Sequence, residues 1–266
     1  MLQPFDRDEL KAAFASAKPF PYIKIDNFLA PEAAEEIAAS YPAFESAVKQ
    51  GRIFTTVNER KKLQITNPAL FPKPVARLNQ LLASPKFLDD LSFITGVPNL
   101  LADEQLVGGG IHMTGPGGRL DVHVDFNFIE DRRLHRRLNL LLYLNSHWEE
   151  NWGGQFQLWD KDVKHRAATF DPIVNRCVIF ETSEISYHGV VPVSPVAPTP
   201  RKSFAAYYYT REAPSHWTGL THGTIFKARP EEKVKGTFLM PAEAAKSKVD
   251  ARIRKLKDRI KGMINR

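Results

Sequence analysis

The residues best suited to chemistry are two histidines and an aspartate that could hold one metal ion. His123 and Asp125 lie two positions apart in the segment HVDFN, and His188 follows 63 residues after Asp125. Alternate residues of a β-strand point to the same side, so one strand could present His123 and Asp125 together. Two imidazoles and one carboxylate are the ligand set of non-haem Fe(II) sites that keep positions open for oxygen chemistry. The set predicts an iron site with His188 as the third ligand.

Zinc is the competing ion for such a ligand set. Structural zinc usually has four protein ligands, often thiolates, whereas this chain has one cysteine, Cys177. Cys177 lies in the apolar segment CVIF, which favours a buried structural thiol. A single cysteine excludes an intramolecular disulfide and is typical of a reducing compartment. We therefore expect iron rather than zinc, and a cytoplasmic protein.

An arginine that follows the second histidine could hold a carboxylate co-substrate. Arg201 lies 13 residues after His188 and opens the strand-like segment RKSFAAYYYT. Three protein ligands leave about three positions on an octahedral ion, enough for a bidentate 2-oxo acid and O2. The far carboxylate of 2-oxoglutarate then needs a cation, and the planar fork of arginine matches a carboxylate best. Ser203 lies two residues further on, so we expect it on the same side as a hydroxyl donor.

The segment RRLNLLLYLN could complete the co-substrate site. Its residues alternate between leucines on one side and mostly polar residues on the other. Such alternation is typical of a strand with one face in the core and one face toward a polar cavity. We therefore expect Asn139 and Tyr143 to form hydrogen bonds with the 2-oxo acid.

The elements that position these residues change character along the chain. The segments PEAAEEIAASYP and PKFLDDLSFITG predict helices in the first hundred residues. From about 105 to 212, short apolar strands alternate with Gly, Pro and Asn turns, and QLVGGGIHM and LDVHVDFNF read as two of these strands. This pattern is typical of an antiparallel sandwich or barrel. We expect an α+β fold with a mainly β core, a double-stranded β-helix (jelly roll), because a wide β cavity suits a central metal.

The C-terminal segment differs from the rest of the chain in charge. Residues 241–266 hold nine Lys/Arg against three Asp/Glu, which is +6 of the net charge of +7. Apolar residues recur there at intervals of four and three from Val249 to Met263, which predicts a basic amphipathic helix. The protein body or a second copy, an anionic membrane surface, and nucleic acid are its candidate partners. We favour packing or homodimer formation, because the stripe is narrow and lacks Trp and Phe.

The remaining residues, 1–240, are expected to form one domain. Its helical support would span about 1–104 and its jelly-roll core about 105–212. Its net charge of only +1 makes an extensive nucleic-acid interface an unfavoured hypothesis. No apolar run is long enough for a transmembrane segment, and the first residues lack the apolar core of a secretory signal.

Several segments together resemble the Fe(II)/2-oxoglutarate-dependent dioxygenases of the prolyl 4-hydroxylase-like type. The resemblance covers about residues 105–212 and is carried by HVDFN, RLNLLLYLN, WEENWGGQFQLWD, the surroundings of His188 and RKSFAAYYYT. The segment PYIKIDNFLAPEAAEEI near the N-terminus also resembles the opening of that group. The resemblance implies a double-stranded β-helix in which His123, Asp125 and His188 hold iron. It also implies 2-oxoglutarate anchored by Arg201.

The resemblance further implies a reaction and its cofactors. Fe(II), 2-oxoglutarate and O2 are expected, with ascorbate as an optional reductant. A C–H bond of the substrate is hydroxylated, and succinate and CO2 are released. Peptidyl or free proline, a sugar or another small molecule are the candidate substrates. The alternative is a non-catalytic or 2-oxoglutarate-independent metal-binding jelly roll of the cupin-like kind.

One position departs from the pattern of these dioxygenases. Many of them carry a tyrosine ten residues before the first ligand histidine, where this chain has Met113 with His112 beside it. That tyrosine helps to bind 2-oxoglutarate, so Tyr143 is expected to take over part of its role.

Overall fold

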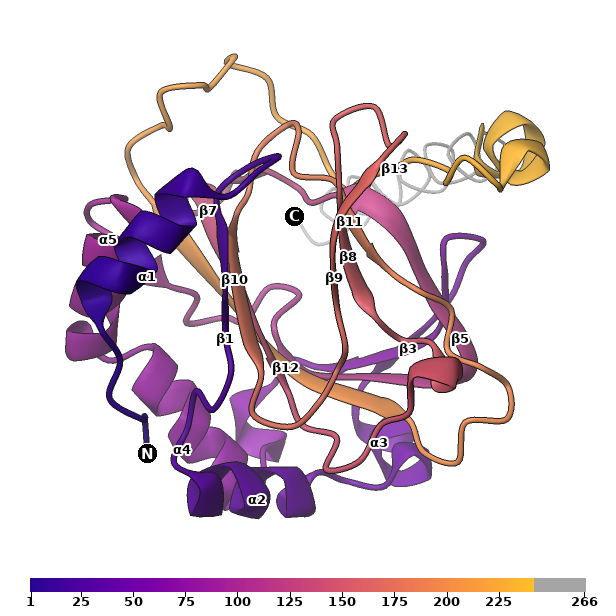
Figure 1. Ribbon diagram of the computed structural model, residues 1–266, viewed down its shortest axis with the longest axis horizontal. Helices are drawn as coiled ribbons and strands as arrows, with labels where there is room; N and C mark the ends of the chain where they lie inside the picture. Colours follow the sequence, from indigo (N-terminus) through magenta and orange to yellow (C-terminus); the bar gives the residue numbers. More distant parts are fainter. Residues whose placement is uncertain (242–266) are drawn as a thin grey trace, which may run out of the picture.

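The computed structural model describes residues 1–241, and the basic helix expected over 241–266 lies almost entirely outside this part of the chain. Within residues 1–241, the α-helices lie before Gly96, with the first three strands between them, and the remaining strands follow (Figure 1). They are α1 (Arg7–Ser16), α2 (Pro31–Ser40), α3 (Phe44–Gln50), α4 (Lys73–Leu82) and α5 (Pro85–Thr95). Short 3-10 turns occur at Pro68–Leu70 and Glu150–Trp152, and a π-helical turn, η3, at Lys235–Leu239.

Local sequence signals explain where these helices begin and end. The Asp6 carboxylate accepts hydrogen bonds from the backbone of Asp8 and Glu9 at the start of α1, which satisfies amide groups that have no partner within the helix. Ser84 caps α5 in the same way, and Gly96 ends it with a left-handed φ of 69°, a conformation that glycine adopts without strain.

The strands form one mixed-length sheet that curves into a double-stranded β-helix, as predicted. They are β1 (Tyr22–Ile25), β2 (Arg52–Thr55), β3 (Glu59–Ile65), β4 (Leu101–Ala102), β5 (Gly110–Val124), β6 (Phe128–Ile129), β7 (Leu134–Tyr143), β8 (Phe156–Trp159), β9 (Arg166–Phe170), β10 (Cys177–Glu181), β11 (His188–Val190), β12 (Arg201–Thr210) and β13 (Ile225–Phe226). Neighbours along the main path follow the order β1-β10-β7-β12-β5-β11-β8-β9.

The strand β5 connects the two halves of this curved sheet. Its residues 110–114 pair with β12, whereas its residues 120–123 pair with β11. The prediction of two separate strands here was wrong, because the Gly-rich segment between them continues the strand. Gly117 takes a φ of 73°, which lets the chain bend without ending the strand.

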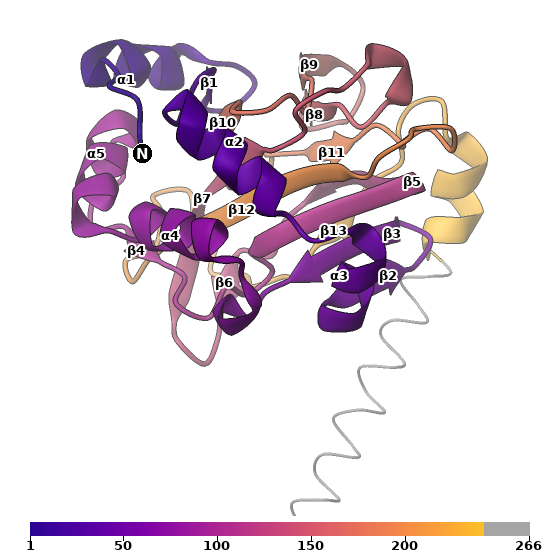
Figure 2. The ribbon, with the colours of Figure 1, turned by 90° about the horizontal axis from the view of Figure 1, so that it is seen from below.

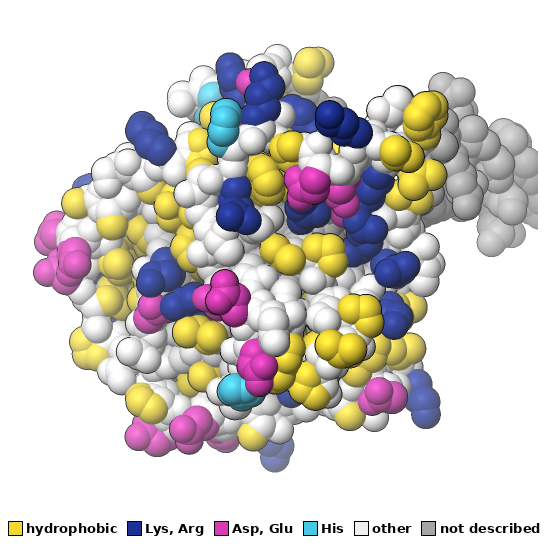
Figure 3. Space-filling view, turned by 45° about the vertical axis from the view of Figure 1, so that its right-hand side comes forward, with side chains coloured by type: hydrophobic (Ala, Val, Ile, Leu, Met, Phe, Trp, Pro, Cys, Tyr) yellow, Lys and Arg dark blue, Asp and Glu magenta, His cyan; other side chains and the backbone are white. Residues whose placement is uncertain are grey.

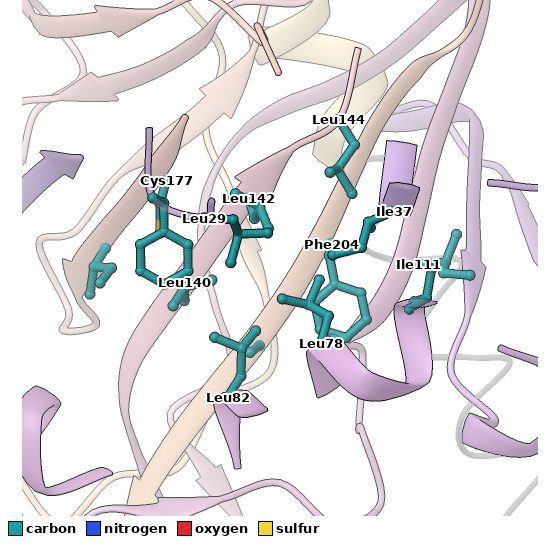
Figure 4. Packing of buried hydrophobic residues seen from close by; sticks show 14 of the residues in the cluster. Leu29, Ile37, Leu78, Leu82, Ile111, Leu140, Leu142, Leu144, Cys177 and Phe204 are labelled. Atoms are coloured by element: carbon teal, nitrogen blue, oxygen red, sulfur yellow. The ribbon is translucent and has the colours of Figure 1, made fainter. Parts of the chain in front are cut away.

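The main core lies between the helices and one face of the sheet. Figure 1 shows α1, α2, α4 and α5 along one side of the strands. Figure 2, which views the molecule from below, shows α2 and α4 covering that face of the sheet. Leu138, Leu140 and Leu142 of β7 point into this layer and are fully buried, as the alternation in the sequence predicted. Figure 4 shows Leu140 and Leu142 near Cys177 and Leu29, with Leu82 of α4 below them. Cys177 is buried, as expected for a structural thiol.

Within residues 1–241, we find no helix that combines the length and apolar character needed to cross a membrane.

Candidate metal and co-substrate site

The three residues expected to hold a metal lie together in the structure. His123 is near the end of β5, Asp125 follows one residue after the strand, and His188 begins β11. β11 pairs with β5 so that His188 lies opposite His123. One ligand atom from each of the three residues lies within 4.8 Å of the other two. This group could hold a single ion.

Both imidazoles are oriented by hydrogen bonds to backbone carbonyls. Nδ1 of His123 lies 2.8 Å from the Asp121 carbonyl oxygen, and Nδ1 of His188 lies 2.9 Å from that of Ser186. A carbonyl only accepts, so each Nδ1 carries the proton and each Nε2 keeps a lone pair. The Nε2 atoms lie 3.7 and 3.4 Å from the carboxylate oxygens of Asp125. The three donors therefore face a common point.

The charge state of the group suits a divalent cation. Burial, together with the neighbouring His188, lowers the pKa of His123 to about 3, and burial also lowers the pKa of His188. Burial alone would raise the pKa of Asp125, but Arg136 and the two histidines outweigh it and hold this pKa well below its usual range. At neutral pH the group thus offers two neutral imidazoles and a carboxylate, the forms that bind metal. This donor set fits Fe(II).

A buried arginine and an asparagine hold the Asp125 carboxylate from behind. The Asn139 amide donates to Oδ2 of Asp125 at 2.7 Å, and Nη2 of Arg136 lies 3.1 Å from the same oxygen. Nε of Arg136 also donates to the Asn139 carbonyl at 2.9 Å, and its guanidinium stacks 3.7 Å from the centre of the Tyr207 ring. Contacts of this kind around a ligand fix its orientation. Arg136 was not singled out from the sequence, where HRR resembles a solvent-exposed segment.

Arg201 is a buried cation without an acidic partner among residues 1–241. It opens β12 and is 5% exposed. Nε donates to the Gly154 carbonyl at 2.7 Å, and Nη1 donates to the Ser203 hydroxyl at 3.4 Å. Burial lowers its pKa, because removing a charge from water is unfavourable unless an opposite charge compensates. A bound carboxylate would supply that charge.

A buried tyrosine lies beside this guanidinium. The Tyr143 ring centre is 4.9 Å from Cζ of Arg201, and Tyr143 is directly opposite Ser203 in the register of β7 and β12. Its hydroxyl is buried and has no hydrogen-bond partner among the described residues. Burial raises the pKa of this hydroxyl, so it remains protonated and able to donate. Arg201, Ser203 and Tyr143 together could bind one carboxylate.

The departure at Met113 has a structural explanation. Met113 packs in the helix-covered core, whereas His112 faces the opposite side of β5, across from Ser203. Nε2 of His112 lies 2.8 Å from the Gly108 carbonyl, which leaves Nδ1 as an acceptor. Burial lowers the pKa of His112 to about 3. On β5, the polar side chain nearest to the expected tyrosine position that faces the site is therefore the neutral imidazole of His112.

Three phenylalanines surround the histidine pair. The rings of Phe180 and Phe156 lie 4.7 and 5.6 Å from that of His188, and the ring of Phe226 lies 5.3 Å from that of His123. Phe226 belongs to β13, which pairs with the end of β5 directly at His123. These apolar walls exclude water from the side of the imidazoles. No local sequence signal marks these three phenylalanines, because their proximity to the histidines depends on strand pairing.

Comparison with known proteins agrees with this geometry. Residues 109–209 match the family model described as the 2OG-Fe(II) oxygenase superfamily. The comparison with curated proteins finds no match.

Solved structures with the same fold include two prolyl hydroxylases. A prolyl-4-hydroxylase from Pseudomonas putida is 19% identical, with a TM-score of 0.53, and the alignment covers 76% of this chain and 99% of that one. A prolyl hydroxylase from Trichoplax adhaerens, solved with a peptide fragment of hypoxia inducible factor, is 17% identical, with a TM-score of 0.55 and coverage of 76% and 90%.

A third similar structure performs different chemistry. The non-heme alpha ketoglutarate dependent epimerase SnoN of nogalamycin biosynthesis is 13% identical, with a TM-score of 0.53 and coverage of 80% and 89%. Identities this low establish the shared fold, while the matched family model establishes the class of oxygenase. The chain thus contains a 2OG-Fe(II) oxygenase domain over residues 109–209 and has the fold of the prolyl hydroxylases.

Proposed function

We propose that this enzyme hydroxylates a C–H bond of a small-molecule or peptide substrate, with Fe(II) held by His123, Asp125 and His188. The observation that carries the proposal is the buried guanidinium of Arg201, which has no acidic partner among residues 1–241. It lies on a strand next to the metal-ligand strand, where the far carboxylate of 2-oxoglutarate would need a cation. When bound, Fe(II) with 2-oxoglutarate and O2 supplies the oxidant and releases succinate and CO2.

The protein contributes orientation and exclusion of water. The backbone carbonyls of Asp121 and Ser186 fix the two imidazoles with Nε2 toward the metal position. Arg201 would bind the carboxylate with two parallel N–H donors, and the hydroxyls of Ser203 and Tyr143 would add one donor each. Anchoring the co-substrate at its far end fixes the position of its 2-oxo acid end at the metal.

Asn139 receives a different role from the one expected from sequence. Its amide donates to Asp125 and its carbonyl accepts from Arg136, so we propose that Asn139 orients the metal-binding carboxylate. Asn139 is four residues from Tyr143 along β7, about 13 Å in an extended strand. That distance is too great for both side chains to contact the same end of 2-oxoglutarate.

Hydroxylation is preferred over the cupin-like alternative because of the candidate co-substrate group, Arg201, Ser203 and Tyr143. A jelly roll that used its metal without 2-oxoglutarate would have no need for a buried, acid-free arginine beside a buried hydroxyl. We therefore propose that the metal and co-substrate groups act as one catalytic unit.

Isotope labelling tests the proposal without knowledge of the substrate. Fe(II)-loaded enzyme turning over 2-oxoglutarate under 18O2 should place one labelled oxygen atom in succinate, and Arg201→Ala should abolish this at low 2-oxoglutarate. The exposed Arg211→Ala should behave as wild type. Iron-loaded enzyme that never consumes 2-oxoglutarate, with or without candidate substrates, would instead support the cupin-like alternative.

We further propose, from the sequence, that residues 1–240 act as one oxygenase domain and that 241–266 mediate homodimer formation. The buried thiol of the single cysteine supports a reducing, cytoplasmic location. Light scattering of the full chain tests the dimer, which Leu256→Glu in the apolar stripe should dissociate. A wild-type monomer at all concentrations would contradict it.

A further inference from the structure

The strand β3 places a lysine on the side of the sheet that faces the metal. Leu63 and Ile65 of β3 are fully buried in the helix-covered core, so Lys62 and Gln64 point to the opposite side. Lys62 pairs with Thr114 of β5, and Thr114 pairs in turn with Arg201 of β12. The lysine thus lies in the same row as the co-substrate arginine, two strands away.

The ammonium of Lys62 is largely shielded from solvent and only partly satisfied. Its side chain is 12% exposed, and its one acidic partner among residues 1–241 is Glu59, at 2.7 Å. An ammonium has three N–H donors, and in this part of the chain the carboxylate of Glu59 is the one acceptor for Lys62. The ammonium also lies 5.0 Å from the centre of the Phe54 ring, and two of its N–H groups have no hydrogen-bond acceptor among residues 1–241.

The strand register places Lys62 beside the residues of the candidate site. Lys62 lies opposite Thr114, which lies opposite Arg201. Gln64, the next residue on the same side of β3, lies opposite His112, which in turn lies opposite Ser203. A molecule bound beside the candidate metal ligands would therefore lie on the side of the sheet that presents Lys62.

We propose that Lys62 binds a carboxylate of the substrate, so that the enzyme acts on a small carboxylic acid. The proposal rests on the proposed function, because it assigns the substrate of that same metal site. A carboxylate is favoured over a phosphate dianion, since the nearby carboxylate of Glu59 would repel the second negative charge. The pair is also complementary to the zwitterion of an amino acid, because Glu59 can accept from an ammonium.

Lys62 is distinct from the anchor of 2-oxoglutarate. Arg201 is more deeply buried, has no acidic partner among residues 1–241 and lies beside the unbonded hydroxyl of Tyr143. Lys62 is already paired with an acid and lies nearer to solvent. Two cations in one row can thus serve two different carboxylates.

Exposed cations near β3 and β5 favour the approach of an anionic substrate. Arg60 and Lys61 are exposed and have no acidic partner among residues 1–241. Arg119, which pairs in register with Arg60, forms ion pairs with Asp121 and Glu232. Figure 3 shows Lys and Arg side chains gathered next to the end of the described chain, with Asp and Glu side chains among them.

A paired panel of compounds tests the assignment. Small carboxylic acids, including free amino acids, are each compared with the corresponding primary amide in the Fe(II)-loaded enzyme with 2-oxoglutarate and O2. The readout is succinate formed above the rate without added compound. We expect stimulation by one or more acids and none by their amides. Lys62→Met should raise the KM for the acid about ten- to a hundredfold, as for the loss of a hydrogen bond between charged groups, and Lys62→Arg should retain part of the affinity.

Lys61→Met is the matched control, because Lys61 is adjacent and exposed, and it should leave all constants unchanged. Stimulation by amides or neutral compounds, no stimulation by any acid, or an unchanged KM in Lys62→Met would overturn the inference. A rise in the KM for 2-oxoglutarate in Lys62→Met would do so as well, since it would make Lys62 a co-substrate contact. Failure of wild-type enzyme to bind 2-oxoglutarate would overturn the proposed function itself, and this inference with it.

Discussion

The two faces of the sheet formed by β5, β12 and β7 differ in chemistry although they share the same strands. Two neighbouring rows across these strands show the difference. The row that faces the helices is apolar and fully buried, and consists of Ile111, Phe204 and Leu142. The next row, one residue along on each strand, is polar and lies on the opposite side, with the candidate metal ligands, and consists of His112, Ser203 and Tyr143.

The comparison separates stability from function. Burial of apolar side chains on the helix-covered face supplies the main favourable free energy of folding. The site-facing side instead contains a buried charge on Arg201 and an unbonded hydroxyl on Tyr143, both of which cost stability in the absence of a ligand. Substitutions on the two faces should therefore have different consequences.

The largest effect is expected from removing a metal ligand. His188→Ala should abolish iron binding and succinate formation, because two ligands alone hold the ion weakly, while the far-ultraviolet circular dichroism spectrum stays unchanged. Iron content and succinate yield measure this. The control is His165→Ala, whose side chain is 85% exposed, and equal iron content in the two variants would contradict the ligand assignment.

The second effect belongs to the helix-covered face. Leu140→Ala leaves a cavity among buried leucines and should lower the free energy of unfolding by about 2 to 5 kcal/mol, measured by urea denaturation. Below the unfolding transition, the KM for 2-oxoglutarate should stay as in wild type. Leu220→Ala, at a position 72% exposed, should change neither quantity, and a selective loss of co-substrate affinity in Leu140→Ala would break the separation of the two faces.

The third effect distinguishes two roles for Asn139, which could orient the metal ligand Asp125 or contact 2-oxoglutarate. Asn139→Ala should weaken iron binding about 10- to 100-fold, as for other residues that orient a metal ligand, because its amide donates to Asp125. Iron titration monitored by enzyme activity measures this, with the exposed Asn151→Ala as control. A raised KM for 2-oxoglutarate with unchanged iron affinity would instead favour the co-substrate role expected from sequence.

The smallest effect concerns the pH dependence of the metal-free protein. Burial lowers the pKa of His112 from 6.5 to about 3, so between these values the unfolded state binds a proton that the folded state does not. The free energy of unfolding then falls as pH falls through this range. His112→Gln should make the decline of Tm between pH 6.5 and 4 shallower, whereas His147→Gln, at an exposed position, should leave it unchanged. A decline as steep in His112→Gln as in wild type would show that His112 is not the source.

The sequence identified residues whose type alone indicates chemistry. Two histidines, an aspartate and an arginine in the expected order were sufficient to predict the group His123, Asp125 and His188, and the position of Arg201 after it. The alternation of β7 correctly placed its leucines on one face, because side chains alternate strictly along a strand.

Relations that depend on pairing between strands could not be predicted. The alternation of side chains along β7 predicted the side of the sheet on which Asn139 lies. It could not predict that Asn139 contacts Asp125, because Asp125 follows another strand, β5. Arg136 reaches the site because the register of β7 and β12 shifts between Tyr208 and Tyr209, and no local signal marks that shift. The Gly-rich segment in β5 indicated a turn, but pairing with strands on both sides keeps it extended.

The most direct test of the central claim is an anaerobic titration of the Fe(II)-loaded protein with 2-oxoglutarate, which follows the weak visible charge-transfer band of the chelate. We expect the band in wild type and in Arg211→Ala, and its loss at equal 2-oxoglutarate in Arg201→Ala. Absence of the band in wild type with iron bound, or an equal band in Arg201→Ala, would contradict the claim that the polar face of the sheet binds both metal and co-substrate.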